Sequence, residues 1–351
     1  MALTRLPQVE FRKPDRIRPG DTVAAISMSW GGAGLFPQVV DVAKQNLADL
    51  LGVTVIDTPH ALAPGDWLYA NPKARAEDLH WALENPEVSG IFSYIGGSES
   101  VRTLEHIDPA LIADHPKVLV GFSDTTCAQS VFLNAGVSCL YGPSLMAGVA
   151  DFGWASYAAA SLEQMLSGWT GLFEPAPGWT EDNSDWEADD FRSAVHATKQ
   201  MFPGGWTWSG QGRGEGQLVG GCVEVLEMLK GTPYFPAREV WSGAVLMLET
   251  SEDVPSPDQV EYWLRNYATQ GILDLVEGLV LARPRGYSVE MRQRLADAVS
   301  KVLAEVGRSE LPVVMDVDCG HTSPMMTLPL GCRVAVDAGA RTFELLEPAV
   351  T

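Results

Sequence analysis

Short apolar segments alternate with helical ones through the first half of the chain, and this alternation is the strongest constraint on the fold. Residues 22–27 (TVAAIS) are predicted as a buried strand, residues 37–51 as a helix and residues 53–56 as the next strand. Further strands are predicted at residues 90–94 and 118–120. A strand–helix–strand rhythm implies a parallel sheet. We therefore expect an α/β protein with an N-terminal parallel-sheet, Rossmann-like domain.

The second half of the chain continues the rhythm. Its expected elements are helices at residues 222–230, 256–269 and 289–306, strands at 243–248, 278–282 and 312–316, and a terminal β-hairpin around Ala338-Gly339-Ala340. A chain of 351 residues favours two domains on size alone. We expect an N-terminal α/β domain over residues 1–166, an irregular linker or lid over 167–216, and a C-terminal α/β domain over 217–351.

The linker is rich in tryptophan, glycine, proline and acidic residues and has little periodicity. An irregular segment of this length in a compact protein is usually functional or a linker. Its tryptophans are Trp169, Trp179, Trp186, Trp206 and Trp208. They either pack the segment onto the body of the protein, which we expect for most of them, or form a lid or stack on a flat ligand. Trp186 differs from the others because its acidic surroundings leave it few apolar sequence neighbours.

Charge and hydropathy argue against two kinds of partner. The chain has 45 acidic and 24 basic residues, a net charge of −21, whereas nucleic-acid binding depends on basic residues that neutralise phosphates. No apolar run approaches the roughly 20 residues of a membrane span. The first residues lack the apolar core of a signal peptide, and five scattered cysteines without a C-x-x-C pair fit reduced thiols. We expect a cytoplasmic protein with no nucleic-acid or membrane partner.

A serine lies between a predicted strand and a predicted helix, in Gly121-Phe122-Ser123-Asp124-Thr125. A sharp turn of this kind exposes the nucleophile of α/β hydrolases, and the helix that follows directs free N–H groups toward it. The motif is G-x-S-x-T rather than the usual G-x-S-x-G. A helix cap formed by Ser123 or Asp124 explains the same residues equally well.

A second glycine turn, Gly96-Gly97, follows the strand predicted at residues 90–94. Sites lie beyond the carboxyl ends of parallel strands, so this turn and the Ser123 turn should face the same crevice. The backbone N–H groups of Gly96-Gly97 could then stabilise an oxyanion beside Ser123. A plain tight turn fits the spacing as well.

A serine nucleophile needs a general base. Of the six histidines, His60 and His321 follow predicted strands, and His321 is preferred because small and polar residues surround it in the sequence. A carboxylate must then orient the imidazole. Glu249, at the end of its own strand, is the best placed, and Glu252 and Asp253 are the alternatives.

A metal site is the competing interpretation of the same region. Asp316, Asp318, Cys319 and His321 are residue types that bind metals. Their spacing does not match a standard zinc motif, so we expect no metal.

Motifs along nearly the whole chain occur in the order found in one family. They are Gly121-Phe122-Ser123-Asp124-Thr125-Thr126, Gly220-Gly221, Gly231-Thr232-Pro233-Tyr234, Leu248-Glu249, Asp318-Cys319-Gly320-His321-Thr322-Ser323-Pro324 and Pro329-Leu330-Gly331. Together they resemble the serine LD-carboxypeptidases. The long tryptophan-bearing insert and Gly212-Arg213-Gly214-Glu215-Gly216 look more like the microcin C immunity peptidase branch than the muropeptide-recycling branch.

The resemblance implies a catalytic triad of Ser123, His321 and Glu249. It also implies an oxyanion hole formed by the Gly97 turn and the Asp124 N–H group. The nucleophile would lie in the N-terminal domain and the other two residues in the C-terminal domain. The enzyme would be a homodimer without a cofactor.

The resemblance also implies a substrate class. These relatives cleave an amide-type bond to a terminal residue, and the immunity peptidases use an aromatic of the insert against the nucleotide, near Trp186 here. Gly96 and Cys222 are the other expected substrate-binding residues, and Cys222 stands where the family usually has asparagine. We expect hydrolysis of aminoacyl-nucleotide, microcin C-like compounds, which would give antibiotic resistance. The alternatives are a muramoyl-tetrapeptide LD-carboxypeptidase in murein recycling and a catalytically weak small-molecule binding protein.

Overall fold

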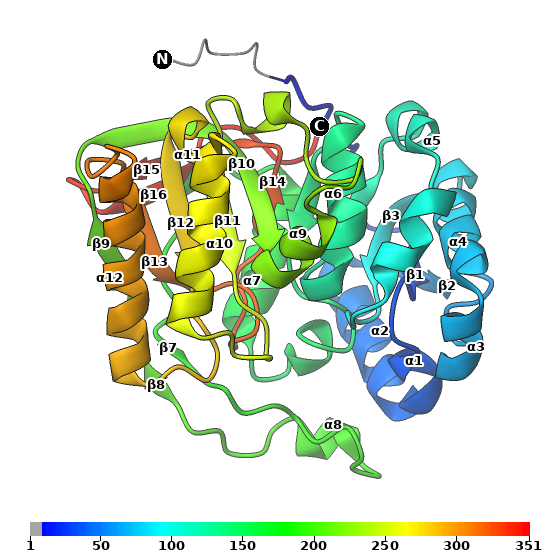
Figure 1. Ribbon diagram of the computed structural model, residues 1–351. Helices are drawn as coiled ribbons and strands as arrows, with labels where there is room; N and C mark the ends of the chain where they lie inside the picture. Colours follow the sequence, from blue (N-terminus) through cyan, green and yellow to red (C-terminus); the bar gives the residue numbers. More distant parts are fainter. Residues whose placement is uncertain (1–8) are drawn as a thin grey trace.

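Two large sheets lie side by side in the computed structural model, which describes residues 9–351 (Figure 1). One has six strands in the order β14-β5-β4-β3-β1-β2, and the other has eight in the order β6-β16-β15-β10-β11-β12-β13-β9. The predicted α/β class is therefore confirmed. The N-terminal residues on which the expectation of no signal peptide rests lie partly outside the described part of the chain. Within residues 9–351, no helix is long and apolar enough to cross a membrane.

The six-stranded sheet contains the predicted parallel core. Its strands are β1 (Thr22–Ile26), β2 (Thr54–Asp57), β3 (Val88–Ser93), β4 (Val118–Gly121), β5 (Cys139–Tyr141) and β14 (Leu328–Leu330). The first five run parallel, and β14 pairs antiparallel with β5. Because β3 and β4 are neighbours, the turns that follow their carboxyl ends lie next to each other.

Helices connect the strands of the six-stranded sheet, and one more helix, α7, comes between β5 and the linker. They are α1 (Gly32–Leu35), α2 (Pro37–Leu51), α3 (Gly65–Ala70), α4 (Pro72–Glu84), α5 (Pro109–Asp114), α6 (Thr126–Asn134) and α7 (Ser156–Ser167). Of these, α2 has the predicted bounds, with proline at its first position and left-handed Gly52 after its last residue.

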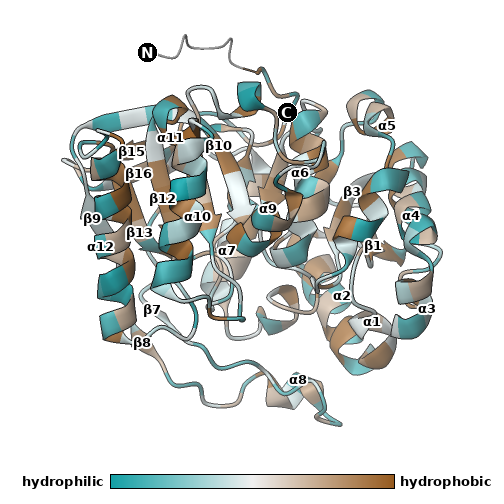
Figure 2. Ribbon diagram, viewed as in Figure 1, coloured by the Kyte–Doolittle hydropathy of each residue, from teal (hydrophilic) through white to brown (hydrophobic). Residues whose placement is uncertain are grey.

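The eight-stranded sheet ends in the predicted hairpin. Its strands are β6 (Gly171–Leu172), β9 (Thr207–Ser209), β10 (Arg213–Cys222), β11 (Val245–Glu249), β12 (Gly278–Ala282), β13 (Val313–Val317), β15 (Arg333–Asp337) and β16 (Thr342–Leu345). The helices of this half are α9 (Val223–Leu229), α10 (Pro257–Thr269), α11 (Ile272–Leu275) and α12 (Val289–Glu305). Figure 2 shows hydrophilic residues on the outward face of α10, in front of the apolar strands of the sheet.

The glycine-rich strand β10 was not predicted. Its glycines interrupt the apolar pattern. They are needed because the neighbouring backbone passes too close to β10 for a side chain. A Cβ added at Gly220 would lie 1.6 Å from the Met247 carbonyl oxygen, and one at Gly216 would lie 2.0 Å from the Gly243 carbonyl oxygen. Close approach of a neighbouring backbone is a common reason for glycine within a strand.

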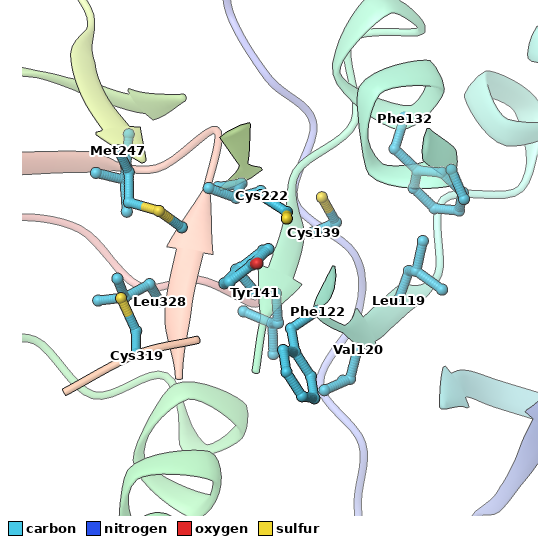
Figure 3. Packing of buried hydrophobic residues seen from close by; sticks show 14 of the residues in the cluster. Leu119, Val120, Phe122, Phe132, Cys139, Tyr141, Cys222, Met247, Cys319 and Leu328 are labelled. Carbon is cyan, nitrogen blue, oxygen red and sulfur yellow. The ribbon is translucent and has the colours of Figure 1, made fainter. Parts of the chain in front are cut away.

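Strand β14 joins the two halves of the protein. It lies within the predicted C-terminal domain, residues 217–351, yet Leu328 pairs with Tyr141 and Leu330 with Cys139 of the N-terminal sheet. Buried residues form one continuous apolar cluster across both sheets, and Figure 3 shows part of it between Leu119 and Met247. The division into two domains therefore stays a prediction. The two predicted segments contribute strands to one common sheet and share one apolar core.

The linker contains only the short elements β6, β7 (Gly178–Trp179), α8 (Phe191–Ala194), β8 (Phe202–Pro203) and β9 before β10 begins. Asp318 attaches it to the C-terminal half: its carboxylate accepts hydrogen bonds from Ala176 N–H (3.0 Å) and Trp206 Nε1–H (2.8 Å) and pairs with buried Arg283. Trp206 therefore packs the linker onto the body, as expected for most of its tryptophans.

Candidate active site

Ser123 occupies a strained turn at the end of β4. Its φ is +58°, a left-handed conformation that is uncommon for residues other than glycine. A Cβ at Gly121, two residues earlier, would lie 2.8 Å from the Thr125 side chain, so only glycine fits there. A 3₁₀ turn from Ser123 to Thr125 leads directly into α6. This is the geometry expected of an exposed nucleophile at a strand-to-helix turn.

His321 and Glu249 lie in line with the Ser123 hydroxyl. His321 Nε2 is 3.1 Å from Ser123 Oγ, and His321 Nδ1 is 2.9 Å from Glu249 Oε2. Glu249, the last residue of β11, is 1% exposed. A hydroxyl, an imidazole and a buried carboxylate in this order can transfer a proton away from the hydroxyl during nucleophilic attack.

Tyr141 is a fourth member of this network that the sequence analysis missed. Its hydroxyl donates to Glu249 Oε1 and accepts the Ser123 backbone N–H at 3.2 Å. Burial and the Glu249 charge raise the pKa of Tyr141 well above its usual value, so the hydroxyl stays protonated. Tyr141 lies in the apolar strand β5, where sequence alone offers no sign of a polar role.

One ring contact and one glycine position the imidazole of His321. Phe122 meets it edge to face, with ring centroids 5.0 Å apart. Gly320 has a φ of +82°, and a Cβ there would lie 2.4 Å from Glu249 Oε2. A side chain at position 320 would therefore push the carboxylate away from the imidazole, which explains the glycine before His321.

A second carboxylate, that of Glu252, also reaches His321. Glu252 Oε2 lies 2.8 Å from His321 Nε2, the nitrogen that faces Ser123. Sequence analysis offered Glu252 as an alternative to Glu249, whereas the structure places the two on opposite ring nitrogens. The hydrogen bond with His321 is the main reason that the pKa of Glu252 falls to about 2. Asp253, the other alternative, is exposed and does not line the cavity at Ser123.

These two carboxylates determine the pH range in which His321 loses its proton. Burial alone would lower the pKa of His321, but the charge and hydrogen bond of Glu249, together with Glu252, outweigh burial and raise that pKa to about 10. Only neutral imidazole accepts a proton, so kcat/KM should rise with pH through a pKa above the ordinary histidine value of about 6.5. A pH profile of kcat/KM measures this, and an acid limb at or below pH 6.5 would contradict it.

The same shift predicts a stability effect of definite sign. A histidine with a raised pKa contributes stability that is fully present below its unfolded-state pKa of about 6.5. That contribution is lost as pH rises through the folded-state pKa of about 10.

The Gly96-Gly97 turn lies against the serine, as its position after β3 predicted. A Cβ at Gly96 would lie 3.0 Å from Ser123 Oγ and 3.3 Å from the Asp124 backbone nitrogen. The Asp124 carboxylate is fully buried and accepts hydrogen bonds from Glu99 N–H (2.9 Å) and Ser100 N–H (2.8 Å). Asp124 therefore ties the residues after the glycine turn to the nucleophile turn.

A cavity of about 600 Å³ opens above Ser123 and His321. The two glycines of the turn after β3 line it, as do aromatic residues from both the N-terminal part and the linker: Trp30, Phe36, Phe122 and Trp186. The side chains of Trp30 and Trp186 are nearly parallel, with an interplanar angle of 15° and centroids 6.2 Å apart. Phe36 meets Trp186 edge to face. Trp186 therefore has apolar partners that are distant in sequence, and Trp30 is an aromatic wall residue that sequence analysis did not identify.

Cys222 lies elsewhere. It is 1% exposed, does not line the cavity, and its thiol faces Glu224 at 3.4 Å. Figure 3 shows it within the apolar packing near Tyr141 and Cys139. Its backbone N–H instead binds Thr126 Oγ1 at 3.1 Å. The structure thus gives no support to direct substrate contact by Cys222.

The residues of the metal hypothesis do not converge. Asp316 accepts a hydrogen bond from Thr207, Asp318 pairs with Arg283, and His321 faces Glu249 and Ser123. Across residues 9–351, no group of three or more histidine, cysteine, aspartate or glutamate side chains is arranged to hold a metal ion.

Comparison with known proteins gives a consistent result. Residues 23–142 match the LD-carboxypeptidase N-terminal domain, and residues 215–336 match the LD-carboxypeptidase C-terminal domain. Microcin C7 self-immunity protein MccF of Escherichia coli is 25% identical over 283 residues, which is 78% of each protein.

Solved structures extend the likeness to the whole fold. An MccF-like protein from Streptococcus pneumoniae in complex with AMP is 26% identical with a TM-score of 0.80, covering 93% of this chain and 98% of that one. MccF in complex with aspartyl sulfamoyl adenosine is 22% identical with a TM-score of 0.85, covering 97% and 100%.

The fold, the serine site and these matches define a serine peptidase of the carboxypeptidase type. The chain belongs to the LD-carboxypeptidase family, as its motifs indicated, and proteins of the microcin C immunity branch are among its relatives.

Proposed function

We propose that this protein cleaves the amide-type bond between an acyl group and a nucleotide-like leaving group, using Ser123, His321 and Glu249 as a catalytic triad. One observation carries the proposal: the same cavity holds the Ser123–His321 pair and the nearly parallel rings of Trp30 and Trp186. An aromatic wall of this kind suits the flat face of a nucleobase.

The reaction follows the chemistry of serine acyl transfer. Ser123 Oγ attacks the scissile carbonyl while His321 Nε2 takes its proton, and Glu249 stabilises the imidazolium. The N–H groups of Gly97 and Asp124 are the proposed donors to the oxyanion. His321 then protonates the leaving nitrogen, which departs and leaves an acyl group on Ser123. Water activated by His321 releases the acid and restores the serine.

Two relatives support the choice of leaving group. MccF has been solved with aspartyl sulfamoyl adenosine and the Streptococcus pneumoniae protein with AMP. Arg285 also lines the cavity of this chain, and it is held there by hydrogen bonds to the carbonyl oxygens of His321 and Glu181. Its positive charge suits a phosphate or sulfamoyl group between the acyl part and the nucleoside.

The test is mass spectrometry of purified protein incubated with a panel of aminoacyl-sulfamoyl adenosines and, separately, with murein tetrapeptide. We expect the amino acid and the sulfamoyl nucleoside as products. Cleavage of the tetrapeptide alone would favour the murein-recycling alternative. Binding without cleavage of either compound would favour the catalytically weak binding protein.

Replacing Trp186 with alanine tests the nucleobase contact. Stacking of a base on an aromatic side chain contributes roughly 1–3 kcal/mol, so KM for an aminoacyl-sulfamoyl adenosine should rise about tenfold or more. Hydrolysis of a short peptide without a base should hardly change. Trp169→Ala is the matched control, because Trp169 lies in the same linker but packs on Phe173 outside the cavity. Equal losses on both substrates would mean that Trp186 only packs the linker.

A cytoplasmic homodimer is also part of the proposal: the dimer comes from the family resemblance, and the location from the five scattered cysteines. Analytical ultracentrifugation of the purified chain at several concentrations measures the assembly, and a monomer at every concentration would reject it.

A further inference from the structure

Glu252 stands out because its carboxylate is exposed and yet contacts the proposed general base. Its side chain is 64% exposed, whereas that of Glu249 is fully buried. Glu252 belongs to the turn after β11 and lines the same cavity as Ser123 and His321. The proposed mechanism gives this carboxylate no function.

The contact is incompatible with the first chemical step. A carboxylate only accepts hydrogen bonds, so at 2.8 Å from Glu252 the nitrogen Nε2 of His321 must carry a proton. Nδ1 also faces a carboxylate, that of Glu249, at 2.9 Å. The ring between them is therefore an imidazolium, which cannot accept the Ser123 proton. Glu252 has to leave Nε2, and the proton on that nitrogen has to pass to water, before the serine can attack.

A cationic group on the substrate is best suited to pair with the Glu252 carboxylate in place of His321. The other acidic side chains that line the cavity are Asp151, Asp185 and Glu187, and Arg285 is the one lysine or arginine among the lining residues of the described chain. The Arg285 guanidinium already donates to the His321 and Glu181 carbonyl oxygens and to the Asn183 side chain. The cavity thus carries more negative than positive charge, and of the carboxylates that line it, Glu252 is the one in contact with the proposed base.

Distance sets where that cation would be on the substrate. The 2.8 Å and 3.1 Å contacts, laid end to end, keep Glu252 Oε2 within about 6 Å of Ser123 Oγ. In an aminoacyl group, the α-amino nitrogen is roughly 2.5 Å from the carbonyl carbon that the serine attacks. An α-ammonium group is therefore within reach of Glu252 when the carbonyl lies at Ser123.

We propose that Glu252 is a specificity residue that binds the free α-ammonium group of the acyl part. Loss of the Glu252 charge from Nε2 lets the imidazolium give its Nε2 proton to water, so that neutral His321 can accept the Ser123 proton. This inference rests on the proposed function for its reaction and adds the class of acyl group: an amino acid with an unblocked amine.

The test compares a free and an N-acetylated aminoacyl-sulfamoyl adenosine that are otherwise identical. The wild-type protein should prefer the free amine by about tenfold or more in kcat/KM, which corresponds to about 1.4 kcal/mol. In Glu252→Gln the free-amine substrate should lose that advantage, so that the ratio approaches one. Asp253→Asn is the matched control, because this neighbouring carboxylate lies outside the cavity, and it should keep the wild-type ratio.

Binding to Ser123→Ala protein, measured by isothermal titration calorimetry with the same two compounds, separates this proposal from the proposed function. Tighter binding of the free amine that disappears in Ser123→Ala/Glu252→Gln supports the role of Glu252 even if wild-type protein hydrolyses neither compound, a result that would overturn only the proposed reaction. Equal turnover and equal binding of the two compounds by protein that retains Glu252 would overturn the role of Glu252. A wild-type preference that persists in Glu252→Gln, or failure of both compounds to bind, would overturn it as well.

Discussion

Ser123→Ala is expected to reduce kcat by about 10⁴-fold or more while the protein remains folded. Removal of the hydroxyl leaves no nucleophile, and the residual rate can come only from binding and from the oxyanion donors. The change removes one oxygen from a side chain whose backbone is held independently by the Tyr141 hydroxyl. Circular dichroism and thermal unfolding should therefore match the wild-type protein, and steady-state kinetics would show the loss.

Covalent labelling gives an independent measurement of the same assignment. A fluorophosphonate reacts readily only with an activated hydroxyl, so mass spectrometry should find Ser123 as the single modified serine. Ser130 is a suitable control because it is buried in α6 and lies outside the cavity. Labelling that persists in Ser123→Ala, or that is lost in Ser130→Ala alone, would reject Ser123 as the nucleophile.

Local patterns were enough to predict much of the fold. The helix α2 and the strand β12 have the bounds that the sequence predicted. α10 begins at the expected Ser256 cap, where Ser256 and Gln259 form a reciprocal capping box. In these elements, neighbouring residues in the sequence determine the structure, so a pattern in the sequence is sufficient.

The elements that were missed depend on contacts distant in sequence. β10 has glycines where an apolar strand would show side chains, because the β11 backbone passes too close for a Cβ at Gly220. β14 is three residues long and pairs with β5, almost two hundred positions earlier in the chain. No local pattern predicts either pairing.

The candidate site divides in the same way. Ser123, Glu249 and His321 could be proposed as a group because each ends or follows a predicted strand, and the structure places Ser123 Oγ and Glu249 Oε2 at 3.1 Å and 2.9 Å from the two His321 nitrogens. Tyr141 and Trp30 could not be identified. The role of Tyr141 arises because β5 lies beside Glu249, and that of Trp30 because the linker residue Trp186 packs against Trp30 and α2. Sequence analysis named both Glu249 and Glu252 as candidates, but it could not distinguish which imidazole nitrogen each would face.

Glu249→Gln is expected to lower kcat by about 10⁴-fold, the scale seen when the carboxylate of a serine triad becomes an amide. Glutamine has the same shape, and its amide can accept a hydrogen bond from His321 Nδ1–H while its NH₂ group faces the Tyr141 hydroxyl. The fold should therefore persist. What is lost is the negative charge beside the imidazole, which is needed to stabilise the imidazolium that forms when Ser123 gives up its proton.

The pH profile distinguishes this role from a structural one. The Glu249 charge is a major cause of the raised His321 pKa, so its removal should move the acid limb of kcat/KM to lower pH as well as lower the plateau. Tyr141→Phe is the matched comparison, because it removes the other hydrogen bond to Glu249 but leaves the carboxylate charge in place. It should cost less turnover than Glu249→Gln and should keep the acid limb above pH 6.5. Near wild-type turnover in Glu249→Gln, together with a loss of turnover on both the free and the acetylated substrate in Glu252→Gln, would transfer the triad role to Glu252. In the described chain, Glu249 and Glu252 are the only carboxylates within hydrogen-bond distance of His321. The pair of variants therefore decides which of them has the triad role.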